Sequence, residues 1–383
     1  MAKSVTRMIR RPLRGKPLIL LILAAVIVLL MIAVILPFQK NESRLAVLIG
    51  SASEDLSWLQ RIRLIFILSR QLDELSQPVG GAGNTSIITV DEGESVISVA
   101  QEMLDGGFIR DKELFLNYLV YRGIDKKILP GKYAMQDNLS ILEVGDHLMD
   151  PAYRLISLTL LPGLRLEEIA DLIEQSGLRF SSEAFLIAAK DYPAELHPAG
   201  GTSLEGYLLA GVYEFKRSIS LESFLNGFVN HFQRIVDEDM VEAFRRNGIT
   251  LEQAVTMASM IGREAMSPEE YPMIASVFYN RLRAGMRFES DPTVQYAVGW
   301  NENQKTWWKN PLELSDLSVY SEYNTYMIAG FPKGPISNSS IEILRAVANP
   351  DQTPFFYFRA KCDGSPYHNF AVTYEEHLQN DCN

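Results

Sequence analysis

Glu264 is the residue whose setting best suits proton transfer. It lies in the stretch Thr256–Pro292, which predicts two short helices broken at Ser267-Pro268, with Ser267 as N-cap and Pro268 as the first helical residue. A helical wheel gives the first helix one apolar face, made of Ala254, Met257, Ala258, Ile261 and Ala265. Glu264 falls at the edge of that face, where partial desolvation would raise the pKa of its carboxyl group and suit it to act as a general acid. The alternative is a surface glutamate that forms an ion pair, with Arg281 on the next helix as a candidate partner.

Histidine, cysteine and glycine patterns do not indicate a metal or cofactor site. The five histidines are scattered, without HExxH or paired cysteine spacing, at His147, His197, His231, His368 and His377. The chain also lacks GxSxG, Walker and dinucleotide-binding fingerprints. We therefore expect chemistry that needs neither a metal ion nor a cofactor.

Three ordered blocks of the sequence resemble the endolytic murein transglycosylases, the YceG-like family. The first two are an A-S-x-x-x-x-E helix and a V-F-x-N-R-L helix, matched by Ala258, Ser259, Glu264, Val277, Phe278, Asn280, Arg281 and Leu282. The second helix leads into a turn, G-M-x-L-Q/E-S/T-D-P-T-V in the family, matched by Gly285, Met286, Phe288, Glu289, Ser290, Asp291, Pro292, Thr293 and Val294. The third block, Y-N-T-Y with a G-x-P-x-G-P-I-x-N segment, is matched by Tyr323, Asn324, Thr325, Tyr326, Gly330, Pro332, Gly334, Pro335, Ile336 and Asn338. The resemblance covers roughly residues 87–378.

This resemblance implies a lytic transglycosylase that cleaves the MurNAc-GlcNAc bond inside peptidoglycan glycan strands. Such cleavage needs a proton on the bridging oxygen and a stabilised oxocarbenium-like transition state. The resemblance implies that Glu264 protonates the leaving oxygen and then, as a base, accepts the proton of the C6 hydroxyl of the same muramic acid. The product would carry a 1,6-anhydro-MurNAc end, and the cut would terminate polymerisation of nascent strands.

Glu289 stands where the family often has Gln, and its role is open. It could hold Glu264 protonated by like-charge repulsion, bind a sugar hydroxyl, serve as the second carboxylate of a hydrolase, or be an exposed turn residue. We expect it in the substrate site. Asp291 is expected to form or cap the turn.

Four further residues are candidate substrate-binding groups. Tyr323, Asn324 and Tyr326 could line a groove by stacking on a sugar or hydrogen bonding to it, or could form a structural turn. Arg281 could orient or balance the charge of Glu264, or extend from a packed helix. Two rival functions follow: a muramidase of the same architecture that admits water, and a non-catalytic peptidoglycan-binding or scaffold protein.

The N-terminal part of the sequence predicts a retained membrane anchor. Residues 18–36 form an unbroken apolar run, long enough to cross the ~30 Å hydrocarbon core. The preceding residues 1–17 carry six basic and no acidic residues, which predicts a cytoplasmic N-terminus and a catalytic domain outside the cell membrane. A cleaved signal peptide is the alternative, but the run lacks a small-x-small cleavage pattern. Beyond residue 40 the chain has a net charge of −18, which disfavours nucleic acid and an anionic lipid surface as partners.

After the anchor we expect an α+β protein. Residues 37–86 are predicted as a stalk or linker, within which Trp58–Leu72 could be a juxtamembrane amphipathic helix or a helix packed on the body. Residues 87–150 predict a strand, two helices, a strand and a helix, which resembles a LysM-like subdomain. Residues 151–378 would be the catalytic domain, with one long helical region at Leu221–Asn247, and 379–383 a tail. The resemblance implies glycan strands and peptidoglycan synthases as partners.

Two cysteines, Cys362 and Cys382, lie near the C-terminus. Outside the membrane they could form one disulfide bond or stay as two free thiols. The sequence leaves both alternatives open.

Overall fold

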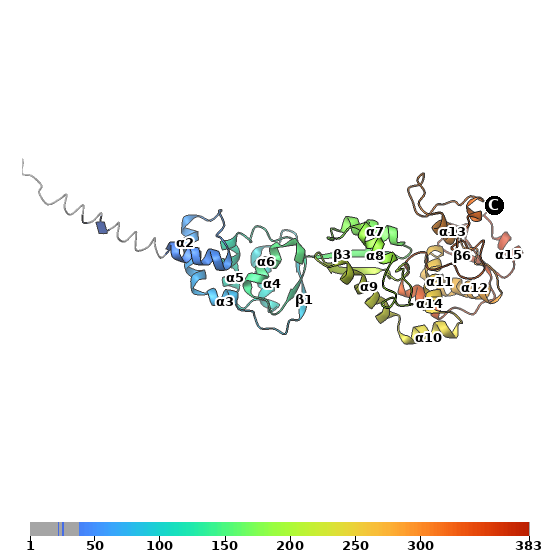
Figure 1. The fold of residues 1–383 in the computed structure, drawn as a ribbon, viewed down its shortest axis with the longest axis horizontal. Helices are drawn as coiled ribbons and strands as arrows, with labels where there is room; N and C mark the ends of the chain where they lie inside the picture. The colour runs from blue at the N-terminus through green and yellow to red at the C-terminus, as the bar shows by residue number, and fades with distance from the viewer. Residues whose placement is uncertain (1–21, 23–24, 27–37, 383) are drawn as a thin grey trace, which may run out of the picture. The chain divides into compact units, whose positions relative to one another are not determined.

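A computed structural model describes residue 22, residues 25–26 and residues 38–382, which form two compact units divided between Arg154 and Leu155 (Figure 1). The units combine helices with small antiparallel sheets, so the predicted mixture of helix and strand is confirmed. The predicted basic segment and most of the predicted anchor, residues 18–36, lie outside the described residues. Among the described residues, no helix is both long and apolar enough to span a membrane.

Unit 1 is built around a two-stranded sheet flanked by short capped helices. Strand β1 (Thr85–Val90) pairs antiparallel with β2 (Gly131–Gln136), so that Thr85 faces Gln136 and Val90 faces Gly131. Between the strands lie α4 (Val96–Asp105) and α5 (Lys112–Arg122), and α6 (Ile141–Met149) and the 3-10 turn η1 (Pro151–Tyr153) follow. The predicted strand-helix-helix-strand-helix order of this segment is confirmed.

The segment before β1 is part of unit 1 and contributes to its core. Residues 38–49 are helical, and α2 (Trp58–Arg70) and α3 (Leu72–Ser76) follow. Leu64, Ile65 and Leu68 of α2 are buried in the same core as the side chains of α5. The sequence allowed α2 to be either a juxtamembrane helix or a helix packed on the body of the protein. Its buried face shows that it packs on the body.

The first part of unit 2 is a second strand-helix-helix-strand arrangement. Strand β3 (Leu155–Leu160) pairs antiparallel with β4 (Gly211–Lys216), with α7 (Leu166–Ser176) and α8 (Ser182–Lys190) between them. The long helical region predicted at Leu221–Asn247 is present, divided into α9 (Leu221–Ile235) and α10 (Glu238–Arg246). The division falls at Asp237, whose side chain accepts a hydrogen bond from the amide of Met240 and caps the second helix.

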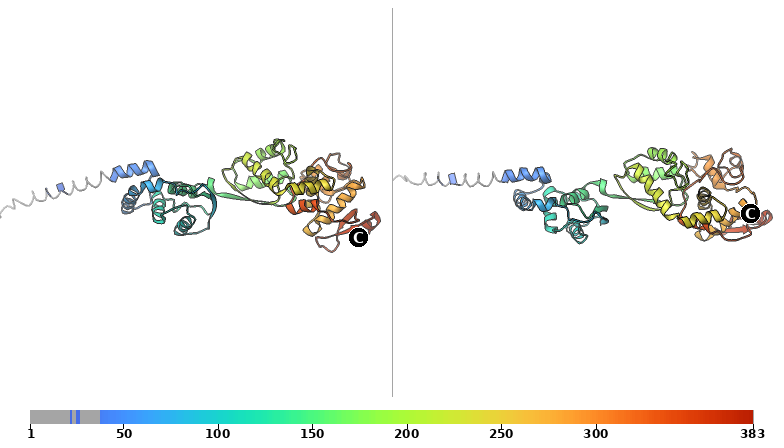
Figure 2. Two further views of the ribbon diagram at one scale, coloured as in Figure 1. Left: turned by 90° about the horizontal axis from the view of Figure 1, so that it is seen from below. Right: turned by 60° about the horizontal axis from the view of Figure 1, so that its bottom comes forward.

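Helix α11 (Leu251–Glu264) lies at the centre of unit 2. It packs against α12 (Tyr271–Arg283) and α14 (Ile341–Ala348), and the three helices lie side by side in every view (Figure 1 and Figure 2). The predicted break between α11 and α12 is present, but Ser267 makes no side-chain capping bond. Pro268 starts a 3-10 turn, η2 (Pro268–Glu270), and α12 starts after it.

The segments that follow α12 surround the C-terminal end of α11. Helix α13 (Asp291–Val298) follows the turn after α12, and the 3-10 turn η3 (Asp316–Ser318) precedes α14. Near the C-terminus, β5 (Tyr357–Ala360) pairs antiparallel with β6 (His368–Ala371), and α15 (Tyr374–Gln379) follows. Cys362 and Cys382 form a disulfide bond, which resolves the alternative that the sequence left open.

Candidate active site

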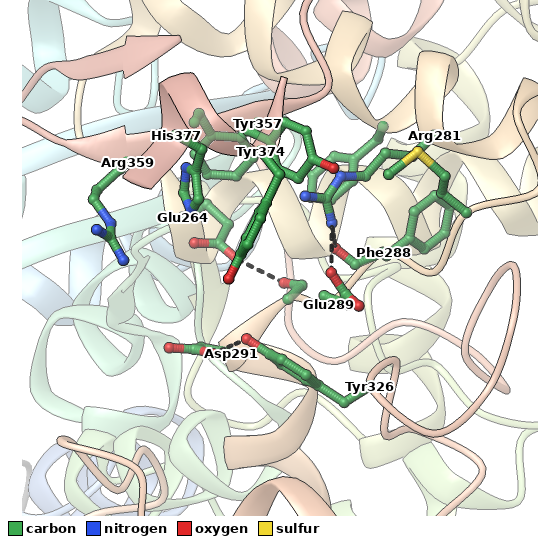
Figure 3. Close-up of a pocket in the computed structure, with 14 residues that line it drawn as sticks. Glu264, Arg281, Phe288, Glu289, Asp291, Tyr326, Tyr357, Arg359, Tyr374 and His377 are labelled. Carbon is green, nitrogen blue, oxygen red and sulfur yellow. Dashed lines mark hydrogen bonds and ion pairs between the residues drawn. The ribbon is translucent and has the colours of Figure 1, made fainter. Parts of the chain in front are cut away.

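A pocket of about 640 Å³ opens at the C-terminal end of α11 (Figure 3). Its walls come from α11, α12, the turn between α12 and α13, the first residue of α13, the turn at Tyr326, strand β5 and α15. The lining residues are Glu264, Phe278, Arg281, Met286, Phe288, Glu289, Ser290, Asp291, Tyr326, Tyr357, Phe358, Arg359, Tyr374 and His377. Of the predicted site residues, the structure brings together Glu264, Arg281, Glu289 and Tyr326 in this pocket.

Glu264 is the last residue of α11 and is half-buried. Its Oε1 accepts a hydrogen bond of 2.6 Å from the Ser290 hydroxyl. Burial raises the pKa of the Glu264 carboxyl to about 7, and the negative charge of Asp291 adds to this, while the Ser290 hydrogen bond and the charges of Arg281 and Arg263 oppose it. A carboxyl group with this pKa exchanges protons readily near neutral pH, as a general acid and base must.

Ser290 is held by a buried set of hydroxyl groups. Its backbone amide donates to the Thr325 hydroxyl at 3.0 Å, and its carbonyl accepts from the Thr293 hydroxyl at 2.7 Å. The two threonine hydroxyls lie 2.8 Å apart, and all three residues are almost completely buried. Ser290 precedes α13 without capping it through its side chain, so its hydroxyl is free to donate to Glu264.

Arg281 contacts Glu289 and the backbone, and no ion pair joins it to Glu264. Its guanidinium group donates to the carbonyl oxygens of Phe288 and Phe356, both at 2.6 Å, and lies 3.6 Å from the Glu289 carboxylate. Arg281 is buried, whereas the Glu289 side chain is 46% exposed. The ion pair between Arg281 and Glu264 that the sequence suggested as an alternative is therefore not formed. Arg281 fixes the turn that carries Glu289 and joins it to the chain entering β5.

Glu289 has a backbone φ of 47°, which places a non-glycine residue in the left-handed region. Its amide donates to the carbonyl oxygen of Thr325. Backbone conformations of this kind persist where the surrounding structure determines them, and they cluster at functional sites. Here the turn directs the Glu289 side chain into the pocket.

Asp291 and Tyr326 form a hydrogen-bonded pair across the pocket from Glu264 (Figure 3). The Tyr326 hydroxyl donates to the Asp291 Oδ1 at 2.7 Å. Burial, the hydrogen bond to Asp291 and the nearby carboxylates all raise the pKa of Tyr326, so its phenol stays protonated. Asp291, expected as a turn residue, is the first residue of α13 and also lines the pocket.

The structure places Tyr323 and Asn324 outside the pocket lining. Asn324 is fully buried, and its side-chain amide donates to the carbonyl oxygens of Leu317 and Val319, which stabilises a turn. Tyr323 packs against Tyr296, with ring centroids 4.7 Å apart. In this block the next residue, Thr325, reaches Glu264 through Ser290.

Several pocket residues were not predicted from the sequence. Tyr357 and Arg359 come from β5, and Tyr374 and His377 come from α15. The His377 ring stacks on the Tyr357 ring with centroids 5.3 Å apart. Tyr357 and His377 fall within residues 87–378, the stretch that resembles the YceG-like family, and that resemblance is the signal that could have placed them in the site.

The described residues contain no group of three or more metal-ligating side chains arranged to hold a metal ion. The pocket instead offers one carboxyl group poised to exchange a proton, two further carboxylates that can stabilise positive charge, and aromatic rings suited to a sugar face. This set of groups fits acid-base cleavage of a glycosidic bond.

Comparisons with known proteins agree with this chemistry. The chain is 29% identical to an endolytic murein transglycosylase of Bacillus subtilis, over 79% of this chain and 86% of the relative. It is 26% identical to an endolytic murein transglycosylase of Streptococcus pneumoniae and spans 57% of that longer protein. A crystal structure of a YceG-like protein from Listeria monocytogenes is similar, with 26% identity and a TM-score of 0.53 over 78% of this chain and 99% of that one. The family model matches residues 88–382, and the chain therefore belongs to the YceG-like family.

Proposed function

We propose that this protein is a membrane-anchored endolytic murein transglycosylase that cleaves MurNAc-GlcNAc bonds within peptidoglycan strands. The observation that carries the proposal is Glu264, a half-buried carboxyl group with a pKa of about 7, inside a pocket lined by tyrosine rings and two further carboxylates. The names of the curated relatives support the substrate class.

In the first chemical step, the protonated Glu264 donates its proton to the glycosidic oxygen that leaves with the next sugar. Positive charge develops at C1 of the muramic acid and on its ring oxygen. The carboxylates of Glu289 and Asp291 line the same pocket and stabilise that charge electrostatically.

In the second step, the Glu264 carboxylate accepts the proton of the C6 hydroxyl of the same muramic acid. The C6 oxygen attacks C1, closing a 1,6-anhydro ring, and Glu264 regains the proton that it lost. Water is not consumed. Tyr326 and the aromatic rings of Tyr357 and Tyr374 bind the sugar, and Arg281 holds the Glu289 turn in place.

The proposal includes the location of the reaction. Residues 18–36 anchor the chain in the cell membrane, and residues 38–382 lie on the outer side. Residues 87–150 form a LysM-like module that positions the glycan strand. Cleavage beside peptidoglycan synthases in the membrane terminates nascent strands.

A water-using muramidase is the second candidate, because the pocket holds a second glutamate. A hydrolase of this kind needs two carboxyl groups at the scissile bond. Glu289 could fill that place, but its ion pair with Arg281 favours a charge-stabilising role.

Mass spectrometry of the products distinguishes the two reactions. The full chain in detergent is incubated with purified peptidoglycan, and the released muropeptides are weighed. A transglycosylase gives ends one water lighter than reducing sugars, and Glu289→Gln lowers the rate while the product stays the same. Reducing ends that are lost in Glu289→Gln would identify a muramidase. Intact glycan with both proteins would indicate a binding protein.

A further inference from the structure

Helix α2 has an exposed apolar face opposite the face that packs on unit 1. Leu64, Ile65 and Leu68 are at most 5% exposed, whereas Trp58 is 69%, Leu59 is 72% and Phe66 is 55% exposed. Leu59 and Phe66 are seven residues apart and so lie on one side of the helix, and Trp58, the first residue of α2, lies about 100° around the helix from Leu59, at the edge of this face. Large apolar side chains gathered on a surface helix indicate a contact with another phase or molecule.

The same face carries positive charge. Arg63 and Arg70 are exposed, and their spacing of four residues from Leu59 and Phe66 places them on the same side. The Arg70 guanidinium lies 4.0 Å from the centroid of the Phe66 ring. Helix α2 contains three arginines and no acidic residue, in contrast to the net charge of −18 beyond residue 40.

An ion pair limits the distance between α2 and the predicted anchor. Arg61, in the first half of α2, donates to the Glu42 carboxylate at 2.7 Å. Glu42 follows the last residue of the apolar run, Leu36, by six residues. Because an extended chain spans at most ~3.5 Å per residue, the backbone of Glu42 lies within about 20 Å of the end of that run, and the ion pair holds the Arg61 side chain beside Glu42. Both Trp58 and Phe66 are within two turns of Arg61.

We propose that the exposed face of α2 rests on the outer surface of the membrane, with Trp58, Leu59 and Phe66 at the boundary of head groups and acyl chains. Arg63 and Arg70 then contact anionic head groups. Tryptophan and phenylalanine beside arginine are typical of helices that lie in the membrane interface. The proposal rests on the anchor at residues 18–36 and does not depend on the catalytic activity.

Fluorescence quenching in vesicles tests the contact. The full chain is reconstituted into phosphatidylglycerol vesicles whose acyl chains carry bromine, which quenches tryptophan at the interface. We expect quenching in the wild type that is largely lost in Trp58→Phe. The matched control is Trp300→Phe, which removes a tryptophan of unit 2 that is 42% exposed. It should retain the lipid-dependent quenching.

A second variant tests the charges. In Arg63→Gln/Arg70→Gln, we expect bromolipid quenching to fall and to lose its sensitivity to salt, because the head-group attraction is removed. Thermal melting checks that each variant still folds. We expect unchanged melting, because all the substituted side chains are exposed.

Two results would overturn the proposal. Equal bromolipid quenching in the wild type and Trp58→Phe would place Trp58 away from the membrane. The second result is that acrylamide fails to quench Trp58 although bromolipids do not quench it either. If this protection from acrylamide is lost when the protein is diluted in lipid, a second copy of the chain covers α2. Neither result depends on peptidoglycan cleavage, so failure of this proposal is separable from failure of the proposed function.

Discussion

The Ser290 hydroxyl should set the pH range over which Glu264 works, and Ser290→Ala removes that control. The hydroxyl donates to Glu264 at 2.6 Å and stabilises the carboxylate form. Its own position is fixed by backbone hydrogen bonds to Thr325 and Thr293, which alanine retains. The substitution therefore removes one hydrogen bond and leaves the turn in place.

The size of the effect follows from the strength of that bond. A hydrogen bond to a charged group is worth about 1.5–3 kcal/mol, and a pKa shift of one unit corresponds to about 1.4 kcal/mol. Losing the bond disfavours the carboxylate, so the pKa of Glu264 should rise by about one to two units. Because the first step needs protonated Glu264, activity falls as pH rises through this pKa.

The assay is the pH dependence of kcat/KM for release of muropeptides, which reports ionisations of the free enzyme. In Ser290→Ala the alkaline limb should move to higher pH by about one to two units. Ser290→Thr keeps a hydroxyl and should return the limb toward the wild-type position. An unchanged limb in Ser290→Ala, or one moved to lower pH, would show that the Ser290 hydroxyl does not lower the pKa of Glu264.

Three further outcomes are expected. The alkaline limb of wild-type activity should lie near pH 7, the pKa of Glu264; a profile flat to pH 9 would contradict this assignment. Glu264→Gln should stabilise the fold at high pH. Because the pKa of Glu264 is raised from 4.5 to about 7 on folding, the free energy of unfolding of the wild type falls as pH rises between these values. Above pH 7 the loss is about 3 kcal/mol, and glutamine avoids it. Melting temperatures that match the wild type at pH 8 would argue against it. Replacing Cys362 and Cys382 by serine should lower the free energy of unfolding by about 3 kcal/mol. It should also raise KM, because α15 lines the pocket but has no buried side chain of its own to hold it there. A KM equal to that of the wild type would show that α15 stays in place without the disulfide bond.

Local sequence patterns predicted most of the elements that carry the site. Helical periodicity and a capping residue determine a helix such as α5, one of the two helices predicted between the strands of residues 87–150, which Asp111 caps by accepting a hydrogen bond from the amide of Leu114. The position of Glu264 at the edge of an apolar face correctly indicated a desolvated carboxyl group. Both signals involve neighbours within a few turns of one helix.

Contacts between distant segments could not be read from such patterns. Arg281 pairs with Glu289 because the turn has a positive φ at Glu289 and brings that carboxylate over the guanidinium group. Asn324 suits both a sugar contact and a structural turn, and only its burial beside two carbonyl oxygens identifies the turn. Tyr374 enters the pocket because α15 packs on β5 and β6, a tertiary contact with no local signal.

In the proposed mechanism, Glu264 alone carries both proton transfers. The most direct test is muropeptide release from purified peptidoglycan by the full chain and by Glu264→Gln, with melting curves confirming that both are folded. We predict 1,6-anhydro products from the wild type and a loss of release of at least about a hundredfold in the variant, since general acid-base catalysis typically contributes 10²–10⁴-fold. Anhydro products formed by a folded Glu264→Gln protein at a rate near that of the wild type would show that another group transfers the protons.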